Sequence, residues 1–448
     1  MNFNFFTKLF SSKKVVVRIA PSPTGLLHLG TARTALFNYL YAKRYGGKFI
    51  VRIEDTDKER SKDEYEKDVL EGLSWLGITH DELFRQSERT EIYTSYLKKL
   101  INSGKAFVSK EESTQNPGTH IEVVRLKNPG EKITFMDEIR GEITFDTTDL
   151  GDFVIARTLT EPLYHLAVVV DDYEMDVTHV IRGEDHISNT PRQILIQRAL
   201  GFREPKYAHI PLILASDRSK MSKRKGSTSI SEYRENGYVK EALINYLAFL
   251  GWNPGTEKEV YSLEELINDF SLEQVQKGGA VFDIQKLNWF NQQHLRALSP
   301  ECYIELLETR NNIPKGLKQL PQYSHERFNK MIKEETERVT TLKELEELIN
   351  KREFNYYFDS PKIDAKLTWK EEGSDTAKKH LGVVIEKLQT LSENAFTTDA
   401  VKETLWGYAE EVGKGSVLWP MRVALSGKEK SPDPFTLAEI FGKEETIN

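Results

Sequence analysis

A strongly basic loop occurs in an otherwise acidic chain. Residues 218–226, RSKMSKRKG, carry five cations and no acid, whereas the whole chain has a net charge of −7. Phosphoryl and adenylyl transfer build negative charge on a leaving pyrophosphate, and one preorganised donor changes such a rate by ~10²–10³-fold. Lys220 and Lys223 are therefore candidate catalytic groups. A solvated loop, or one in nonspecific contact with RNA, would explain this composition equally well.

A second candidate is the segment 21–31, PSPTGLLHLGT, where a helix is expected to begin directly after a strand. Backbone N–H groups and the helix dipole then face a ligand crevice. His28 can donate to a phosphate oxygen, and Gly30 lacks a Cβ where a flat ring or a phosphate must approach the backbone. Taken alone, this short motif is more simply explained as a structural turn with a core histidine.

Two arginines, Arg18 and Arg182, lie near the ends of apolar runs that predict strands. Open α/β sheets bind ligands at the carboxyl ends of their strands. Two guanidinium groups suit a carboxylate, the Tyr164 hydroxyl can add a donor, and Glu54 suits an ammonium group. These residues predict a zwitterionic substrate with an acidic side chain. The alternative is that both arginines point outward into solvent.

The elements that must position these residues follow from hydrophobic periodicity. Residues 13–20 predict a buried strand and residues 48–57 a second one. Between them, an apolar stripe predicts a helix that is closed by Gly46 and Gly47; the stripe consists of Ala32, Ala35, Leu36, Tyr39 and Leu40. A strand–helix–strand unit predicts a doubly wound, Rossmann-like α/β domain with a parallel sheet. Further strands are expected at 163–172, 177–186 and 208–217, and a helix at 189–201.

Changes in composition divide the 448 residues into several parts. We expect a tail over 1–13, a catalytic domain over 14–85 and 164–230, and an inserted α+β domain over 86–163. A helical region should follow over 231–300 and a separate helical domain over 301–448. In that last domain, Thr341 and Glu344 predict a capping box. An apolar stripe that ends at Gly413 is formed by Val401, Leu405, Ala409 and Val412.

Composition also excludes several classes of protein. With 39% hydrophobic and 29% charged residues, the chain is typical of globular proteins. Its one cysteine, Cys302, excludes an internal disulfide and a cysteine-based zinc cluster, and favours a reducing, cytoplasmic setting. No apolar run reaches the ~18 residues that span a bilayer. The P-loop, GxGxxG and HExxH patterns are absent from the sequence, which disfavours P-loop ATPases, Rossmann dehydrogenases and zinc proteases.

Four segments taken together resemble bacterial-type glutamyl-tRNA synthetases, a class I family. They are, in chain order, RIAPSPTGLLHLGTARTALFNYL, GGKFIVRIEDTD, VIRGEDHISNTPRQ and SKMSKRKG. The stretch VLWPMRVALSGKEKSPDPF is similar to the anticodon-binding end of that family, so the resemblance runs from about residue 14 to 445. It implies that glutamate and ATP, with Mg²⁺, give glutamyl-adenylate and pyrophosphate. The glutamyl group then moves to the 3′-terminal adenosine of tRNA-Glu.

The resemblance also implies roles for individual residues and parts. Residues 28–31 and the basic loop are similar to the two signatures that flank ATP in class I synthetases. Segments 86–163 and 231–300 would contact the acceptor stem and its neighbourhood, and 301–448 would bind the anticodon, in a monomeric cytoplasmic enzyme. By this resemblance, the substrate's side-chain carboxylate would be held by Arg18, Tyr164 and Arg182. Its amino group would be bound by Ser22 and Glu54. The ATP would be bound by Asp185, His28, Gly30, Lys220 and Lys223. No general base is required, since positioning and charge stabilisation suffice.

The sequence departs from the family pattern at one site. Ser109 and Glu111 stand where many relatives carry zinc-binding cysteines, so no zinc is expected. The segment PSPTG and Thr31 differ from the PEPNG and histidine of glutaminyl and archaeal-type relatives. Intact nucleotide motifs argue against a catalytically inactive tRNA-binding paralogue, and the helical C-terminal domain argues against a generic nucleotidylyltransferase. The sequence leaves open whether tRNA-Gln is also charged.

Overall fold

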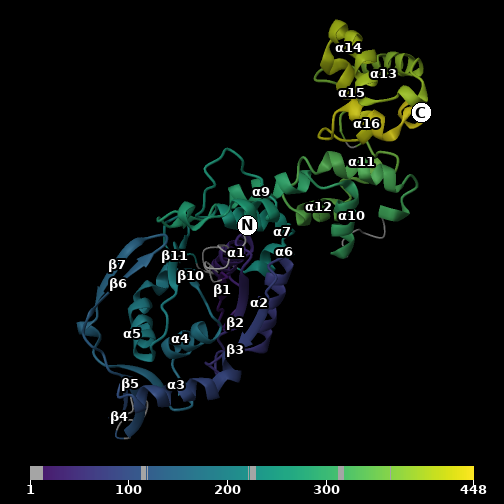
Figure 1. The fold of residues 1–448 in the computed structure, drawn as a ribbon. Helices are drawn as coiled ribbons and strands as arrows, with labels where there is room; N and C mark the ends of the chain where they lie inside the picture. The colour runs from purple at the N-terminus through teal and green to yellow at the C-terminus, as the bar shows by residue number, and fades with distance from the viewer. Residues whose placement is uncertain are drawn as a thin grey trace, which may run out of the picture. The chain divides into compact units, whose positions relative to one another are not determined.

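The protein consists of two compact units, one ending at Phe290 and the other formed by Asn291–Asn448. The computed structural model describes residues 14–112, 118, 120–219, 221, 229–310, 317–363 and 365–448. In Figure 1 the first unit runs from purple to green and contains every strand of the described residues, and the second, in green and yellow, is helical. This mixed α/β architecture with a helical C-terminal unit confirms the predicted fold class.

A parallel sheet forms the centre of the first unit. Its first part has the order β1 (Val16–Ile19), β2 (Lys48–Ile53), β3 (Glu82–Arg85), and β10 (His179–Gly183) pairs in parallel with β11 (Lys206–Ile210). Thr178 joins the two parts: its N–H donates to Val16 O at 2.9 Å, and its Oγ1 accepts from Val16 N at 2.9 Å. Strands β1 and β2 are buried almost throughout, as expected for a sheet covered on both faces.

Helices connect these strands and hold the strand ends, where the candidate residues lie, in position. They are α1 (Leu29–Arg44) between β1 and β2, α2 (Asp63–Trp75) between β2 and β3, and α5 (Thr190–Leu200) between β10 and β11. The predicted helices at the α1 and α5 positions are confirmed, and α5 ends at Gly201 in the left-handed region, with φ +71°. Strands β1, β2 and β10 confirm strands expected there. The single strand expected at 208–217 is wrong in extent, because β11 covers only its start and a separate short strand, β12 (Ile213–Leu214), follows.

One predicted strand is wrong. Residues 163–172, LYHLAVVVDD, lie mostly in helix α4 (Tyr164–Glu174) rather than in a strand. Residues 166–172 are all buried, and four of them pack into the core formed with the sheet, α5 and α3 (Thr90–Asn102), namely Leu166, Ala167, Val169 and Val170. The helix therefore shows no exposed polar stripe that would reveal its period. A short, uniformly apolar run does not distinguish a buried helix from a buried strand.

Between β3 and α4, the described residues include an α-helix and two antiparallel arrangements of strands. Helix α3 (Thr90–Asn102) precedes a sheet of β4 (Ala106–Glu112), β5 (His120–Leu126), β8 (Phe153–Thr158) and β9 (Glu161–Pro162). The hairpin of β6 (Lys132–Asp137) and β7 (Gly141–Asp146) joins the central sheet instead, with Asp137 paired to Tyr207 of β11. The inserted segment thus supplies two strands to the sheet edge. The domain boundaries proposed from the sequence stay a prediction.

Short elements complete the first unit after β11. They are β12 (Ile213–Leu214), α6 (Ile230–Glu235), α7 (Lys240–Phe249), α8 (Leu263–Asp269), β13 (Ala280–Val281) and α9 (Ile284–Arg296), the last of which continues into the second unit. Strand β12 pairs in parallel with β13. Within the described ranges, no helix is both long and apolar enough to cross a membrane.

The second unit is built from helices. They are α10 (Pro300–Thr309), α11 (His325–Glu335), α12 (Leu342–Asn350), α13 (Ser374–Gln389), α14 (Thr398–Val412), α15 (Lys414–Ser426), α16 (Pro434–Phe441) and α17 (Lys443–Ile447). Half of the predicted capping box is present, because Thr341 Oγ1 accepts from Glu344 N, whereas the Glu344 carboxylate accepts from Thr340 N. The apolar stripe predicted on α14 is buried at Val401, Leu405 and Ala409. Its last member, Val412, is 38% exposed at the end of the helix.

Candidate active site

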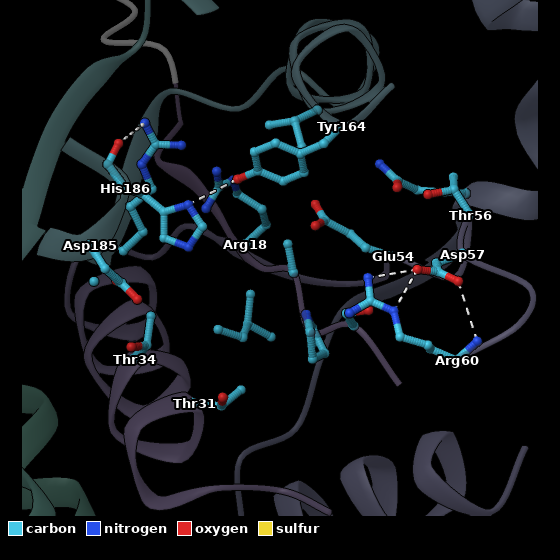
Figure 2. Close-up of a pocket in the computed structure, with 18 of the residues that line it drawn as sticks. Arg18, Thr31, Thr34, Glu54, Thr56, Asp57, Arg60, Tyr164, Asp185 and His186 are labelled. Carbon is cyan, nitrogen blue, oxygen red and sulfur yellow. Dashed lines mark hydrogen bonds and ion pairs between the residues drawn. The ribbon is translucent and has the colours of Figure 1, made fainter. Parts of the chain in front are cut away.

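One pocket of about 1140 Å³ is lined by all the candidate residues that the structure describes. It lies at the carboxyl ends of β1, β2 and β10 and at the N-terminus of α1. Its lining includes the eight residues Arg18, Ser22, His28, Gly30, Glu54, Tyr164, Arg182 and Asp185, several of which are labelled in Figure 2. Lys220 and Lys223 lie outside the described residues, but Met221 between them lines the pocket.

His28 caps the helix whose N-terminus faces this pocket. Its Nδ1 accepts a hydrogen bond of 3.1 Å from the backbone N–H of Gly30. An accepting Nδ1 in a neutral imidazole places the ring proton on Nε2, so Nε2 is the donor of the ring. The cap therefore fixes the tautomer that can donate to an anion near the helix N-terminus, where the dipole also favours negative charge.

Packing within the protein does not require glycine at position 30. A Cβ placed there would have His28 Nδ1 as its nearest neighbour, at 3.5 Å, which is an ordinary van der Waals distance. Gly30 nevertheless lines the pocket in the first turn of α1. The space beside its backbone is therefore available to a ligand.

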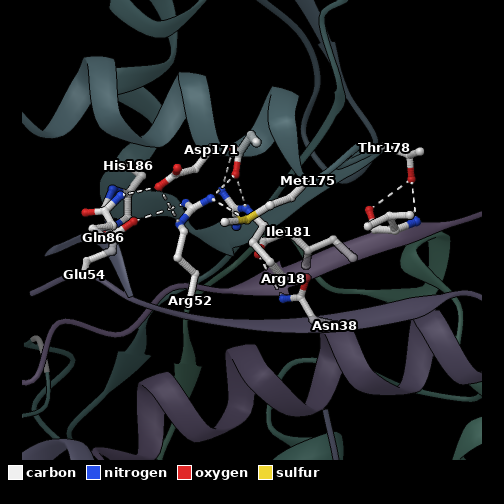
Figure 3. Close-up of polar contacts among 12 residues, drawn as sticks. Arg18, Asn38, Arg52, Glu54, Gln86, Asp171, Met175, Thr178, Ile181 and His186 are labelled. Carbon is white, nitrogen blue, oxygen red and sulfur yellow. Dashed lines mark hydrogen bonds and ion pairs between the residues drawn. The ribbon is translucent and has the colours of Figure 1, made fainter. Parts of the chain in front are cut away.

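Arg18 is held inside the protein by an acid of helix α4. Its guanidinium donates to Asp172 from Nε at 3.0 Å and from Nη2 at 3.3 Å, and the residue is only 4% exposed. Arg52 Nη1 donates to the same carboxylate at 2.6 Å. Figure 3 shows the two arginines meeting beneath α4. Burial opposes the ionised form of Asp172, but Arg18 and Arg52 outweigh it and lower the pKa of this carboxyl.

Glu54 continues this network toward the pocket. Its Oε1 accepts from Arg52 Nη2 at 3.2 Å. Burial raises the pKa of Glu54, against the opposing effect of Arg52 and Arg18. Its carboxylate is therefore short of compensating positive charge, and an ammonium group bound beside it would relieve that deficit.

Asp171, the neighbour of Asp172, anchors the other side of the network. It accepts hydrogen bonds from Gln86 Nε2 at 2.9 Å, Arg89 Nε at 2.7 Å and Tyr93 Oη at 2.8 Å. Sequence reasoning missed both aspartates and Arg52. The available signal was the pair of acids that ends the apolar run VVVDD, since buried carboxylates require partners.

Arg182 lies across the pocket from a different strand and is also buried. Its Nε donates to His209 Nε2 at 3.1 Å and its Nη2 to Thr190 Oγ1 at 2.9 Å. In the described part of the chain, the buried Nη1 has no hydrogen-bond partner. Burial lowers the pKa of Arg182, with Arg18 adding to this effect. An unpaired, buried cationic nitrogen is costly, so an anionic ligand here would be strongly favoured.

Tyr164 and His186 complete the wall between the two arginines. The Tyr164 hydroxyl lies 3.1 Å from His186 Nδ1, a contact drawn in Figure 2. Burial raises the pKa of Tyr164, so the phenol stays protonated. Burial and the nearby Arg182 lower the pKa of His186 to about 4, which keeps its ring neutral near pH 7. Sequence reasoning missed His186, although it directly follows Asp185.

Asp185 lies beyond the end of β10, in a 3₁₀ turn, Glu184–Asn189. A Cβ on Gly183 would come within 2.5 Å of Asp185 Oδ1, so glycine at this position permits the observed place of the carboxylate. Asp185 and the α1 N-terminus line the same pocket.

The site where relatives were expected to carry cysteines contains an ion pair. Glu111 Oε1 on β4 lies 2.5 Å from Arg125 Nε on β5. In the described ranges, no group of three His, Cys, Asp or Glu side chains is arranged to hold a metal ion. The absence of zinc stays a prediction.

Comparison with known proteins identifies the family. Residues 14–116 and 110–289 match the model of the catalytic domain of class I tRNA synthetases (E and Q), and residues 303–448 match the anticodon binding domain. The chain therefore belongs to the class I tRNA synthetases of the E and Q type.

Similar proteins are glutamate–tRNA ligases. That of Thermodesulfovibrio yellowstonii is 40% identical, over 97% of this chain and 98% of the relative. That of Carboxydothermus hydrogenoformans is 41% identical over 96% and 98%. A crystal structure of a glutamate tRNA ligase from Elizabethkingia meningosepticum in complex with its amino acid matches with a TM-score of 0.82 and 33% identity, over 97% and 98% of the two chains.

Proposed function

We propose that the protein is a glutamate–tRNA ligase. It activates L-glutamate with ATP to glutamyl-adenylate and pyrophosphate, and transfers the glutamyl group to the 3′-terminal adenosine of tRNA. The observation that carries the substrate assignment is the pocket itself, which combines two buried arginines, Arg18 and Arg182, with the carboxylate of Glu54. Two cations and one anion complement an amino acid whose side chain is acidic.

In this proposal, the glutamate side-chain carboxylate is bound by Arg18, Arg182 and the hydroxyl of Tyr164. The unpartnered Nη1 of Arg182 supports this role, because a carboxylate oxygen would satisfy it. Glu54 and Ser22 receive the amino group. The deficit of positive charge around Glu54 supports its part in the assignment.

ATP, with its Mg²⁺, is a substrate that occupies the α1 side of the pocket. His28 donates from Nε2 to a phosphate oxygen, the backbone beside Gly30 admits the nucleotide, and Asp185 contributes a carboxylate. Lys220 and Lys223, on the basic loop, stabilise the leaving pyrophosphate. Catalysis then consists of holding the glutamate α-carboxylate near the α-phosphate and neutralising the charge that develops on the leaving group.

The nucleic-acid partner is tRNA-Glu, in a cytoplasmic, monomeric enzyme. The match of residues 303–448 to an anticodon binding domain supports a tRNA substrate. Segments 86–163 and 231–300 would contact the acceptor stem and its neighbourhood. Whether tRNA-Gln is a second substrate depends on anticodon contacts and is decided by the experiment below.

The decisive experiment is aminoacylation of purified tRNA-Glu and tRNA-Gln in parallel, each with glutamate and with glutamine. We expect glutamyl-tRNA-Glu to form and no transfer of glutamine. Transfer of glutamine in place of glutamate would contradict the substrate assignment. Failure of the purified protein to charge any tRNA, despite tRNA binding, would favour the inactive paralogue.

A further inference from the structure

We infer that Asp137 and His209 are positioning residues for Arg182, and that they fix the guanidinium that selects an acidic side chain. This inference rests on the proposed function. It adds that recognition of the amino acid depends on β6, a strand of the inserted segment. Asp137 is the last residue of β6, and His209 lies on β11 beside the strand of Arg182. Neither residue lines the pocket.

Both oxygens of the Asp137 carboxylate accept hydrogen bonds. Its Oδ1 accepts from Ile139 N at 3.0 Å and from Arg140 N at 2.8 Å, and its Oδ2 accepts from His209 N at 3.0 Å. Oδ2 also lies 2.6 Å from His209 Nδ1. Burial opposes its charge, but these hydrogen bonds outweigh burial and lower the pKa of Asp137. The group facing His209 Nδ1 is therefore a carboxylate, which only accepts hydrogen bonds.

This carboxylate determines which nitrogen of His209 carries the proton. Nδ1 must donate to Asp137, so Nε2 is left as an acceptor in the neutral ring. Burial lowers the pKa of His209, which keeps the ring neutral. Arg182 Nε donates to Nε2 at 3.1 Å, whereas an N–H at Nε2 would place two donors face to face.

The orientation of Arg182 follows from this acceptor. His209 engages Nε, and Thr190 Oγ1 with the His186 carbonyl engages Nη2, at 2.9 and 3.5 Å. These contacts fix the plane of the guanidinium and leave Nη1 for a ligand. A guanidinium without the His209 acceptor would lose one of the contacts that fix its orientation, so its planar fork of donors would no longer be held toward a carboxylate.

The test separates this positioning role from a merely structural pairing of β6 with β11. In Asp137→Asn, the amide oxygen takes the place of Oδ1, which accepts from the Ile139 and Arg140 N–H groups and lies 3.3 Å from the His209 backbone N. The NH₂ of the amide then faces His209 Nδ1. The His209 proton then moves to Nε2, and Arg182 Nε loses its acceptor. We expect the KM for glutamate to rise about 10- to 100-fold, with the KM for ATP unchanged, because an unsatisfied buried donor of this kind costs roughly that ratio.

Asp146→Asn on the same hairpin is the matched control, since Asp146 is exposed and, in the described ranges, its side chain hydrogen-bonds only to Thr148. It should leave both KM values unchanged. In a His209→Leu background, Asp137→Asn should cause no further rise in glutamate KM, because the histidine through which it acts is gone. Additive effects, or equal effects on glutamate and ATP, would overturn the inference.

A spectroscopic measurement tests the proposed tautomer of His209 separately from the proposed reaction. Nitrogen-15 NMR of histidine-labelled protein, with the His209 signals assigned by their loss in His209→Leu, reports which ring nitrogen is protonated. We expect a protonated Nδ1 in the native chain and a protonated Nε2 in Asp137→Asn. An Nε2 proton in the native chain would overturn the inference, whereas native tautomers in a protein without aminoacylation activity would overturn only the proposed function.

Discussion

Arg18 donates two hydrogen bonds to Asp172, from Nε at 3.0 Å and from Nη2 at 3.3 Å. The two residues are 154 positions apart in the chain, and the acid also receives Arg52 Nη1 at 2.6 Å. Arg18 is therefore oriented before any ligand binds. A cation that is already fixed loses less conformational freedom on binding its substrate, which favours both affinity and selectivity.

The first prediction concerns this buried network. Asp172→Asn should lower the free energy of unfolding by about 3–5 kcal/mol, because two buried arginines lose charge compensation. It should also raise the KM for glutamate, since Arg18 is no longer held in one plane. Urea denaturation and activation kinetics measure the two effects. Asp176→Asn is the control, because Asp176 is exposed just beyond α4 and should tolerate the change.

The second prediction separates folding from nucleotide binding at Gly30. Gly30→Ala should leave stability unchanged or raise it by up to ~1 kcal/mol, because alanine favours helix and meets no close neighbour. ATP affinity should fall about 10- to 100-fold, as a methyl group intrudes on the ligand's space. Gly407→Ala, in the open on α14, should change stability alone. Unchanged ATP affinity in Gly30→Ala would remove this position from the nucleotide site.

The third prediction tests recognition of the amino group. Glu54→Gln removes the negative charge beside Arg52 and should weaken binding of L-glutamate about 100-fold through loss of a charge-assisted hydrogen bond. Glutarate has the same two carboxylates but no ammonium group, so its weaker binding should be unaffected by Glu54→Gln. Calorimetric titration of both ligands checks this difference. A parallel loss for glutarate would show that Glu54 acts on the pocket as a whole.

The fourth prediction is a pH dependence of stability. Burial, with Lys206 and Arg203, lowers the pKa of His179 to about 4, and burial lowers the pKa of His165 to the same value. Unfolded histidine titrates near ~6.5. Between these values the unfolded chain binds protons that the folded chain does not, so stability falls as the pH is lowered from 6.5 to 4.

His179→Gln isolates one contribution to this dependence. His179 bonds to Tyr41 and Thr178, away from the proposed substrate groups. Urea midpoints measured across the pH window should show a slope smaller by about one proton in this variant. An unchanged slope would mean that His179 is protonated in the folded protein.

The sequence predicted the strands and the helix that carry the first half of the site. Arg18, Glu54 and His28 follow regular local patterns, namely a β-branched run and a helix start, and their positions at strand or helix ends are set by a few neighbouring residues. Arg182 could be predicted for the same reason. The roles of all these side chains remain proposals.

Their partners could not be predicted in this way. Asp172 and His209 come from distant parts of the chain, and their contacts depend on how helix α4 and strand β11 pack. The uniformly apolar run before Asp172 concealed a helix, so even its side-chain directions were wrong in the strand interpretation. Buried acids at the end of such a run indicate that partners exist, but not which residues they are.

The hydrogen bonds between Val16 and Thr178 have a consequence for synthesis. They join β1 to the strand of Arg182 across 162 residues. At the ~5–20 residues per second of translation, β1 must wait roughly 8–30 s before its neighbour has been made. During that interval the cationic pocket does not exist, so a nascent chain exposes one unpaired edge of β1 and acquires the proposed substrate site only after Arg182 has been translated.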